Sequence, residues 1–355
     1  MIELALIPGD GVGPEVMGEV ISVLAWAQAR GRALRWAIFP YGAEHFLETG
    51  ESLSDEHFAQ LRDEFDAILF GAVGDPRIPD GRHADALLLR LRRELQLNVN
   101  FRPCHPWLDR LFPLKGIPAR DVNIEVFREN TEGPYCMQGE SSETRGVDFA
   151  VHTWPAIERL LTAAFQRAET IHGAVALAHK ANVMKHGHGL WMRVFKDIAG
   201  RFPDVQARAV HADALLCELV QDPRRFQVIA ADNFVGDLVS DLLAAFQGGM
   251  GTAPSASWSP HRPYRCTALF EPVHGSAPDI AGKNMANPIG MFLSTALLFR
   301  HLGWECEAAL LESAVRQTLE AGVATRDIAP GNDGVATGAI CTCSEMGAAI
   351  RSRLL

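Results

Sequence analysis

The stretch from Phe226 to Asp241 constrains the fold of this 355-residue chain more than any other. The run from Phe226 to Asp232 is apolar and ends in a turn, which is typical of a buried parallel strand. The next residues have the spacing of a helix whose leucines, Leu238 among them, face a core. A strand followed directly by a helix is the unit of α/β sheets, and such sheets bind ligands beyond the carboxyl ends of their strands. The stretch therefore predicts an α/β fold with a site after this strand.

Two carboxylates lie at that position. Asp237 and Asp241 are four residues apart, so on a helix they share one face, with Cβ atoms roughly 5–6 Å apart, and repel each other. A divalent cation removes that repulsion, and Mg²⁺ and Mn²⁺ prefer carboxylate oxygens. The alternative is a solvated acidic face near a helix N-terminus, where the dipole favours Asp. The position after a strand favours the metal site.

Composition excludes several classes of protein. A net charge of −10 argues against a nucleic-acid or anionic-membrane surface. No run approaches the roughly 20 apolar residues of a membrane span, and the first eight residues are too short for a signal-peptide core. Seven cysteines, without a second pair at zinc spacing beside Cys341 and Cys343, indicate buried reduced thiols. The sequence predicts a cytoplasmic protein.

A glycine-rich turn follows the first expected strand, Glu3 to Ile7. Gly9 and Gly11 fit the start of a dinucleotide-binding fingerprint, but Pro14 occupies the place of its third glycine. No acid follows about 20 residues later to hold a ribose. We therefore expect no Rossmann fold, although such a turn can still contact an anion or a nucleotide amide.

Three arginines lie beside apolar runs. Arg92 belongs to a helix expected from Asp85 to Leu95, and Arg102 and Arg128 each adjoin an expected strand. Most single arginines are solvated. Three guanidinium groups that converge would instead bind carboxylates with bidentate geometry. The sequence does not show whether they converge.

Acid–base candidates occur in the middle of the chain. Tyr135 follows a Gly-Pro turn, and Lys180 ends a strand and is expected to open a helix at Ala181. A lysine beside a helix N-terminus and another cation suits a general base. Asp213 is a third acid flanked by apolar residues. The histidines near Lys180, including His188, are not expected to bind a metal, because no carboxylate or cysteine completes a ligand set nearby.

A polar loop, Phe270 to Ala281, lies late in the chain. Its acid, Asp279, could accept both ribose hydroxyls of an adenosine and exclude a 2′-phosphate by charge. Two helices, Met291 to Leu302 and Glu305 to Ala321, are expected next. A glycine-rich loop from Gly331 and a last helix complete the chain.

Six ordered motifs carry a resemblance to a known family. They are Ile7-Pro-Gly-Asp-Gly-Val-Gly-Pro-Glu15, Leu91-Arg-Arg with Arg102-Pro, Arg128-Glu-Asn-Thr-Glu-Gly, Lys180-Ala-Asn, Gly236-Asp-Leu-Val-Ser-Asp241 and Glu271-Pro-Val-His-Gly-Ser-Ala-Pro-Asp279. Together they resemble the β-decarboxylating hydroxyacid dehydrogenases, which include the isocitrate, isopropylmalate, homoisocitrate and tartrate/D-malate enzymes. The match runs from about residue 4 to about residue 338.

The resemblance implies an α/β fold of two domains that share a twisted mixed sheet. The first domain would comprise residues 1–100 and 250–355, and the second residues 101–249. It also implies an obligate homodimer with shared active sites, NAD, and Mg²⁺ or Mn²⁺, and it leaves a potassium ion open. The NADP-dependent members carry Lys-Tyr where this chain has Asp279-Ile280, which favours NAD.

The resemblance also implies roles for individual residues. Lys180 of the partner would take the hydroxyl proton as hydride leaves the substrate, and Tyr135 would return a proton to carbon after CO₂ departs, with the metal as Lewis acid. The implied substrate residues are Arg92, Arg102, Arg128, Asp85, Leu88 and Leu89, and the metal ligands are Asp237, Asp241 and the partner's Asp213. The implied cofactor residues are Glu271, His274, Gly275, Ser276, Ala277, Asp279, Ile280 and Asn287.

The substrate stays open among related acids. Glu129-Asn-Thr-Glu-Gly133, Gly71-Ala-Val-Gly74 and Asn287-Pro-Ile-Gly290 look most like tartrate/D-malate dehydrogenases. Leu88 and Leu89 would instead suit the isopropyl group of 3-isopropylmalate, and homoisocitrate is the next alternative. Ala86 and Leu88 disfavour isocitrate. A non-catalytic subunit is disfavoured because every metal and acid–base residue is present, and a binding module would not require all of them.

Overall fold

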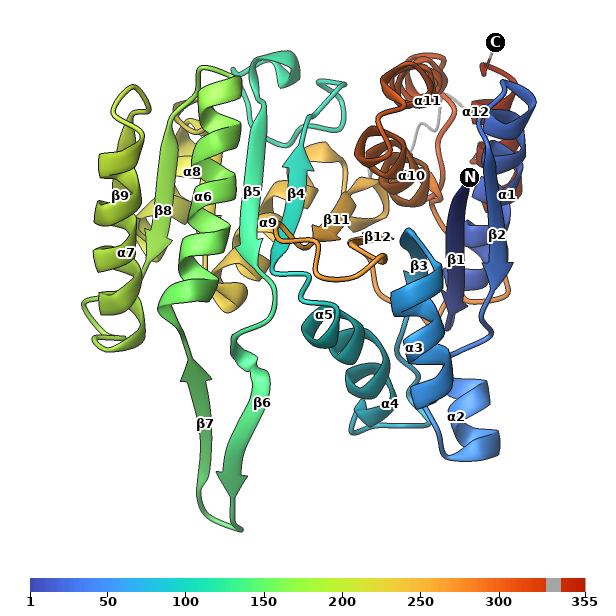
Figure 1. The fold of residues 1–355 in the computed structure, drawn as a ribbon. Helices are drawn as coiled ribbons and strands as arrows, with labels where there is room; N and C mark the ends of the chain where they lie inside the picture. The colour runs from blue at the N-terminus through green and yellow to red at the C-terminus, as the bar shows by residue number, and fades with distance from the viewer. Residues whose placement is uncertain (330–339, 355) are drawn as a thin grey trace.

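A ten-stranded mixed sheet forms the centre of the molecule (Figure 1). The computed structural model describes residues 1–329 and 340–354. The strand order is β2-β1-β3-β12-β11-β4-β5-β10-β8-β9. The strands are β1 (Ile2–Gly9), β2 (Leu34–Ile38), β3 (Ala67–Ala72), β4 (Val99–Cys104), β5 (Ile124–Glu129), β8 (Val175–His179), β9 (Ala207–His211), β10 (Val228–Ala231), β11 (Pro254–Trp258) and β12 (Ala268–Pro272).

Most neighbouring strands are parallel, and only the centre of the sheet is antiparallel. There β11 pairs antiparallel with both β12 and β4, and β4 pairs antiparallel with β5. Parallel strands that are covered on both faces consist of continuous apolar runs, and every residue of β3 and β10 is buried. The mixed sheet confirms the α/β fold expected from the motifs.

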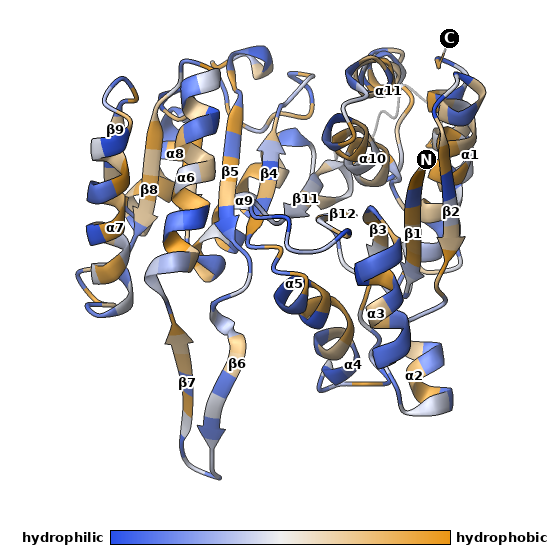
Figure 2. Ribbon diagram, in the orientation of Figure 1, coloured by the Kyte–Doolittle hydropathy of each residue, from blue (hydrophilic) through white to orange (hydrophobic). Residues whose placement is uncertain are grey.

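Helices cover both faces of the sheet, because successive side chains of a strand point to opposite faces. In β8, Val175 and Leu177 pack under α6 and α7, whereas Ala176 and Ala178 pack against the side of α8 and α9. Figure 2 shows the hydrophobic residues along β1 and β8. The helices are α1 (Gly13–Ala29), α2 (Ala43–Thr49), α3 (Asp55–Glu64), α4 (Arg82–Ala84), α5 (Arg90–Glu94), α6 (Trp154–Thr170), α7 (Gly187–Arg201), α8 (Ala212–Gln221), α9 (Asn233–Gln247), α10 (Ile289–His301), α11 (Glu305–Glu320) and α12 (Cys343–Arg351).

Four hydrophobic clusters divide between the two halves of the sheet. Two of them consist mainly of buried residues from β1, β3, β12 and the helices at the two ends of the chain. The other two draw largely on residues between β4 and α9. Trp258 packs against one cluster of each kind. This distribution supports the two-domain division, residues 1–100 with 250–355 and residues 101–249, which stays a proposal.

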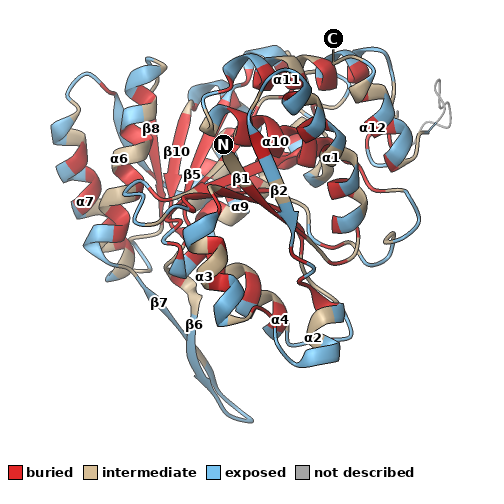
Figure 3. Ribbon diagram, turned by 45° about the vertical axis from the view of Figure 1, so that its right-hand side comes forward, coloured by how far each residue is buried: buried red, intermediate tan, exposed pale blue. Residues whose placement is uncertain are grey.

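A two-stranded hairpin projects from the body of the molecule. It consists of β6 (Gly133–Ser141) and β7 (Gly146–Val151), and most of its residues are exposed (Figure 3). Met137 and Phe149 are exposed apolar residues on this hairpin. Within the described residues, the start of β6 contacts α9, whereas the exposed outer part of the hairpin is a two-stranded ribbon, which by itself is only marginally stable in water.

Several local expectations were wrong. The helix expected from Asp85 to Leu95 is interrupted by a π-helical turn, Asp85–Leu89, between α4 and α5. Lys180 opens a turn, and α7 begins only at Gly187. Leu238 does not face the core of α9; it is 49% exposed. All seven cysteines are free as expected, but Cys217 and Cys306 are exposed rather than buried.

The end of the chain is described in part. Helix α12 is present, whereas the glycine-rich loop expected from Gly331 lies outside the described residues. Among the helices of the described chain, none is long and apolar enough to cross a membrane.

Candidate active site

The expected acidic pair lies on one face of α9, beside two arginines. Arg128 Nη1 pairs with Asp237, and Arg102 Nη1 lies 3.3 Å from Asp237 Oδ1 and 3.5 Å from Asp241 Oδ1. The helix begins directly after β10, with Asp232 as its N-cap. A strand end therefore presents both carboxylates at one edge of the sheet, as the sequence suggests.

The two carboxylates differ in their electrostatic environment. Burial would raise the pKa of Asp237, but the guanidinium groups of Arg128 and then Arg102 hold that pKa below its ordinary value. Burial, followed by the charge of Asp237, raises the pKa of Asp241. Asp241 is therefore the incompletely neutralised member of the pair, and an added cation would stabilise its ionised form.

The structure brings the three arginines together. All three are buried. Burial, and then the positive charge of Arg128, lower the pKa of Arg102 to about 10, and Arg92 adds to this effect. Mutual repulsion of this kind requires neighbouring guanidinium groups. Such a cluster of buried cations is a site for an anion.

Arg92 also has a spare donor. Its Nη2 donates to Glu271 Oε1 at 2.6 Å, and both side chains are buried. Its Nε is buried without a hydrogen-bond partner in the described residues. Because an unpaired buried donor is costly, this Nε–H favours a bound acceptor. Glu271, a predicted cofactor residue, thus contacts Arg92, a predicted substrate residue.

Tyr135 lies beside the acidic pair. Its hydroxyl donates to Asp237 Oδ2 at 2.9 Å, and the Arg128 guanidinium lies 5.0 Å from the centre of its ring. Burial raises the pKa of Tyr135, against the opposing effect of Arg128. The phenol therefore remains protonated near neutral pH, as a proton donor must.

Lys180 and Asp213 form a separate pair. Lys180 Nζ lies 2.6 Å from Asp213 Oδ1. Within the described residues, no ion pair or hydrogen bond joins either of them to Asp237 or Asp241. Lys180 therefore has an anionic partner, whereas a neighbouring cation would have suited the general-base role considered from the sequence.

The π-helical turn presents the expected substrate-reading residues. Leu87 points into the core, whereas Leu88 and Leu89 are only partly buried. Asp85 begins the turn, and burial raises its pKa. π-helical turns occur frequently at functional sites. The sequence placed these residues on a regular helix and gave no signal of this turn.

A cavity of about 300 Å³ lies at the predicted cofactor loop. Of the predicted cofactor residues, His274, Ala277, Ile280 and Asn287 line it. Gly275, Ser276 and the exposed Asp279 belong to the same loop. The lining residues that the sequence did not indicate are Gly251, Met285, Ala286, Arg326 and Asp327, together with Val12 from the first glycine turn.

The glycine turn is held against this loop. Val12 N donates to Ser276 O at 2.8 Å. Gly11 has a φ of +58°, and a methyl group there would lie 1.9 Å from Ser276 O. Only glycine permits this close approach. The first loop thus helps to form the cavity, although it lacks the dinucleotide fingerprint.

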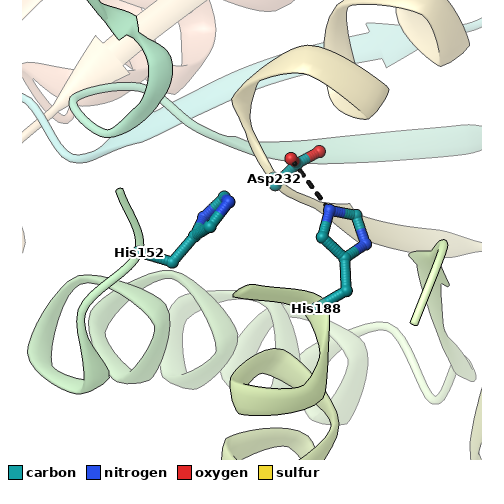
Figure 4. Close-up of side chains that lie close together, drawn as sticks. All are labelled: His152, His188 and Asp232. Carbon is teal, nitrogen blue, oxygen red and sulfur yellow. Dashed lines mark hydrogen bonds and ion pairs between the residues drawn. The ribbon is translucent and has the colours of Figure 1, made fainter. Parts of the chain in front are cut away.

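Sequence reasoning missed a second cluster, behind Lys180. His152, His188 and Asp232 place ligand-type atoms within 4.8 Å of one another (Figure 4). Asp232 is 44 residues from His188 in the chain, so local spacing gave no signal of the pairing. The one sequence signal for this cluster was the position of Asp232 as the expected N-cap of the following helix, which would place its carboxylate at the start of that helix.

The class defined by fold and site is an α/β protein with an acidic pair, a buried arginine cluster and a separate cavity. The chain matches the family described as isocitrate/isopropylmalate dehydrogenase over residues 3–350. It is 42% identical to 3-isopropylmalate dehydrogenase of Streptomyces avermitilis over 324 residues, covering 90% of this chain and 92% of that protein. The 3-isopropylmalate dehydrogenase of Mycobacterium tuberculosis is 40% identical over 330 residues, with 92% and 95% covered.

A solved structure agrees with these relatives. The crystal structure of isocitrate dehydrogenase from Methylococcus capsulatus superposes with a TM-score of 0.87 at 32% identity, covering 100% of this chain and 99% of that chain. The chain belongs to the isocitrate/isopropylmalate dehydrogenase family. It is an oxidoreductase of the decarboxylating hydroxyacid type, and enzymes of this family use NAD and Mg²⁺ or Mn²⁺.

The residues present fit both cofactors. The incompletely neutralised Asp241 beside Asp237 supplies the oxygen ligands that these hard cations require. The cavity at the His274 loop offers a predominantly apolar lining, and the buried Nε2 of His274 has no hydrogen-bond partner in the described residues. A nucleotide would fill the cavity and satisfy this nitrogen.

Proposed function

We propose that the protein oxidises and decarboxylates 3-isopropylmalate with NAD. The observation that carries this proposal is the pair of partly buried leucines, Leu88 and Leu89, one turn before Arg92. An isopropyl group can pack on such a surface, whereas a hydroxyl group there would lose hydrogen bonds to water without replacement. The names of the relatives at 40–42% identity support the same substrate. Both observations favour 3-isopropylmalate over tartrate or D-malate, which the sequence motifs had favoured.

The roles of the residues follow from their chemistry. Arg92, Arg102 and Arg128 bind the two carboxylates of the substrate. These carboxylates take the place of Asp237 as partners of Arg102 and Arg128. Lys180 accepts the proton of the substrate hydroxyl, and Tyr135 donates a proton to carbon after CO₂ leaves. When bound, NAD supplies the hydride acceptor and the divalent cation supplies Lewis acidity. Asp237, Asp241 and the partner's Asp213 hold the cation.

Two copies of the chain form each active site in this proposal. Lys180 and Asp213 pair with each other and not with the acidic pair of their own chain. Helix α9 exposes Phe234 and Leu238 side by side, and Val183, close to Lys180, is 68% exposed. Exposed apolar residues of this kind mark interaction surfaces. A homodimer would cover them and bring Lys180 to the acidic pair of the other chain. The free thiols suit the cytoplasm, a location that also stays a proposal.

Substrate identity is tested by kcat/KM values with NAD and Mn²⁺ for 3-isopropylmalate, D-malate, tartrate, homoisocitrate and isocitrate. We expect 3-isopropylmalate to give the highest value. The variant Leu88→Ala/Leu89→Ala should lower it by about 10- to 200-fold and leave kcat/KM for D-malate nearly unchanged. A higher kcat/KM for tartrate or D-malate in the unmodified protein would refute the substrate.

The shared site is tested by complementation between two inactive variants, Lys180→Met and Asp241→Asn. In a mixed dimer, one site combines an intact Lys180 with an intact Asp241 only if these residues come from different chains. After random exchange of subunits we expect about a quarter of wild-type activity. No recovery, with mixed dimers demonstrated by native mass spectrometry, would place Lys180 in the site of its own chain.

A further inference from the structure

The cluster behind Lys180 is organised around His188. The backbone N–H of Lys180 donates to His188 Nδ1 at 2.7 Å. On the other side of the ring, Nε2 lies 3.2 Å from Asp232 Oδ2, and both side chains are almost completely buried. His188 therefore lies between the turn that carries Lys180 and the start of α9.

The partners of the two histidines determine their tautomers. A backbone N–H can only donate, so His188 Nδ1 accepts and its proton is on Nε2, facing Asp232. His152 Nδ1 in turn accepts from Trp191 Nε1–H at 3.2 Å. Its proton is therefore also on Nε2, which is buried without a partner in the described chain. Burial lowers the pKa of His152, so this ring is neutral.

These tautomers disfavour a metal ion in the cluster. A histidine that binds a metal through one nitrogen normally donates a hydrogen bond through the other. Here the second nitrogen of each ring already accepts a hydrogen bond, and Nε2 carries the proton. His188 Nε2 instead donates its proton to Asp232.

Asp232 gives the cluster a fixed anchor. Its Oδ1 accepts from Val235 N at 2.8 Å as the N-cap of α9, while Oδ2 faces His188. The helix N-terminus and the hydrogen bonds together stabilise a buried carboxylate. Its position is thus set by the same helix that carries Asp237 and Asp241.

We infer that His188, anchored by Asp232, is a positioning residue for Lys180, an inference that rests on the proposed role of Lys180 as the base. Strand β8 ends at His179, so the amide of Lys180 is the first one beyond the ladder. Without His188 this amide would lose its acceptor. The turn from 180 to 184 could then shift, and displacements of about 1 Å at a catalytic group can cost 100-fold in rate.

The test compares two polar replacements that preserve different bonds. In His188→Asn the side-chain oxygen takes the place of Nδ1 and can still accept from Lys180 N. In His188→Gln the amide nitrogen takes the place of Nε2, so the bond to Asp232 is retained and the bond to Lys180 is lost. His188→Leu loses both.

We expect kcat close to wild type for His188→Asn and about 10- to 100-fold lower for His188→Gln and His188→Leu, with little change in KM. The isotope effect on kcat with C2-deuterated 3-isopropylmalate should rise in the two slow variants. Amide hydrogen exchange at Lys180 should accelerate in the same two variants. His301→Leu is the matched control, since His301 is a partly buried histidine whose side chain forms a hydrogen bond only with Thr267 in the part of the chain that the structure describes.

The outcomes separate this inference from the proposed function. Equal kcat and equal Lys180 amide exchange in His188→Asn and His188→Gln would overturn the positioning role. If His188→Leu does not fold, the Asn and Gln variants decide alone. If Lys180→Met loses activity while His188→Asn and His188→Gln have equal kcat and equal Lys180 amide exchange, the positioning role of His188 is refuted and the role of Lys180 as the base stands. Wild-type kcat in Lys180→Met would refute the role of Lys180 itself, and with it the inference.

Discussion

Arg92 Nη2 donates a hydrogen bond of 2.6 Å to Glu271 Oε1, which connects the predicted substrate arginine to the end of β12, just before the cofactor loop. The two residues are 179 positions apart in the chain. Both are buried, so the pair holds its geometry more firmly than an exposed ion pair would. The bond leaves Arg92 Nε without a partner among the described residues and fixes the guanidinium relative to the cavity at His274.

Asp241→Asn should weaken Mn²⁺ binding, because it removes the negative charge of Asp241, which Arg102 and Arg128 neutralise only in part. We expect a loss in affinity of at least about 10-fold, since even outer partners of metal ligands have effects of that size. Isothermal titration with Mn²⁺ measures it, and turnover should fall in parallel. Asp63→Asn, which removes an exposed carboxylate paired with Arg62, is the control. Unchanged affinity and activity in Asp241→Asn would remove this residue from the metal site.

Asp279→Lys should shift the cofactor preference toward NADP. The carboxylate of Asp279 is exposed beside the cavity, where its charge opposes a 2′-phosphate and a lysine would attract one. We expect the ratio of kcat/KM for NADP to that for NAD to rise by about tenfold, which corresponds to about 1.4 kcal/mol. Glu48→Lys introduces the same charge on an exposed helix and should not alter the ratio. An unchanged ratio in Asp279→Lys would contradict the assignment of this loop.

Gly236→Ala should disturb the arginine cluster. A methyl group at Gly236 would lie 2.8 Å from Cγ and 2.9 Å from Cβ of Arg128, and the buried Arg128 has little room to move. We expect a loss of about 1–3 kcal/mol in the free energy of unfolding and a higher KM for the hydroxyacid. Urea denaturation and steady-state kinetics measure these effects. In Gly18→Ala, where no atom of the described residues lies within 4 Å of the added methyl group, the helix should gain about 0.5–1 kcal/mol.

Glu129 should make stability depend on pH. Burial raises the pKa of Glu129 to about 7, from an ordinary value of 4.5. Between these values the folded protein retains a proton that the unfolded chain releases, so the free energy of unfolding falls as pH rises. Glu129→Gln has no such proton. From pH 5 to pH 8 its free energy of unfolding should rise relative to wild type by on the order of 2 kcal/mol.

Urea denaturation at four pH values and one protein concentration measures this difference. Glu143→Gln, at an exposed position of the hairpin loop, should run parallel to wild type. A constant difference between Glu129→Gln and wild type across the range would show that Glu129 is ionised in the folded protein well below pH 7.

The fold and the candidate residues differ in how far the sequence predicted them. Strand-then-helix patterns such as Phe226–Asp241 predicted the α/β sheet, because burial on both faces requires continuous apolar runs. The same patterns placed Asp237 and Asp241 on one face, because that follows from helical spacing alone. The π-helical turn at Asp85–Leu89 and the exposure of Leu238 were not predictable, since both depend on packing against distant elements.

By itself the sequence determined the order of the elements, the family and the types of residue that could act, because these follow from local periodicity and ordered motifs. Only the tertiary structure decided which side chains meet. It joined Arg92 to Glu271, Lys180 to Asp213, and His188 to Asp232. Such contacts arise where strands distant in the chain end side by side, and the energies that select them depend on burial and on charges that no local stretch contains.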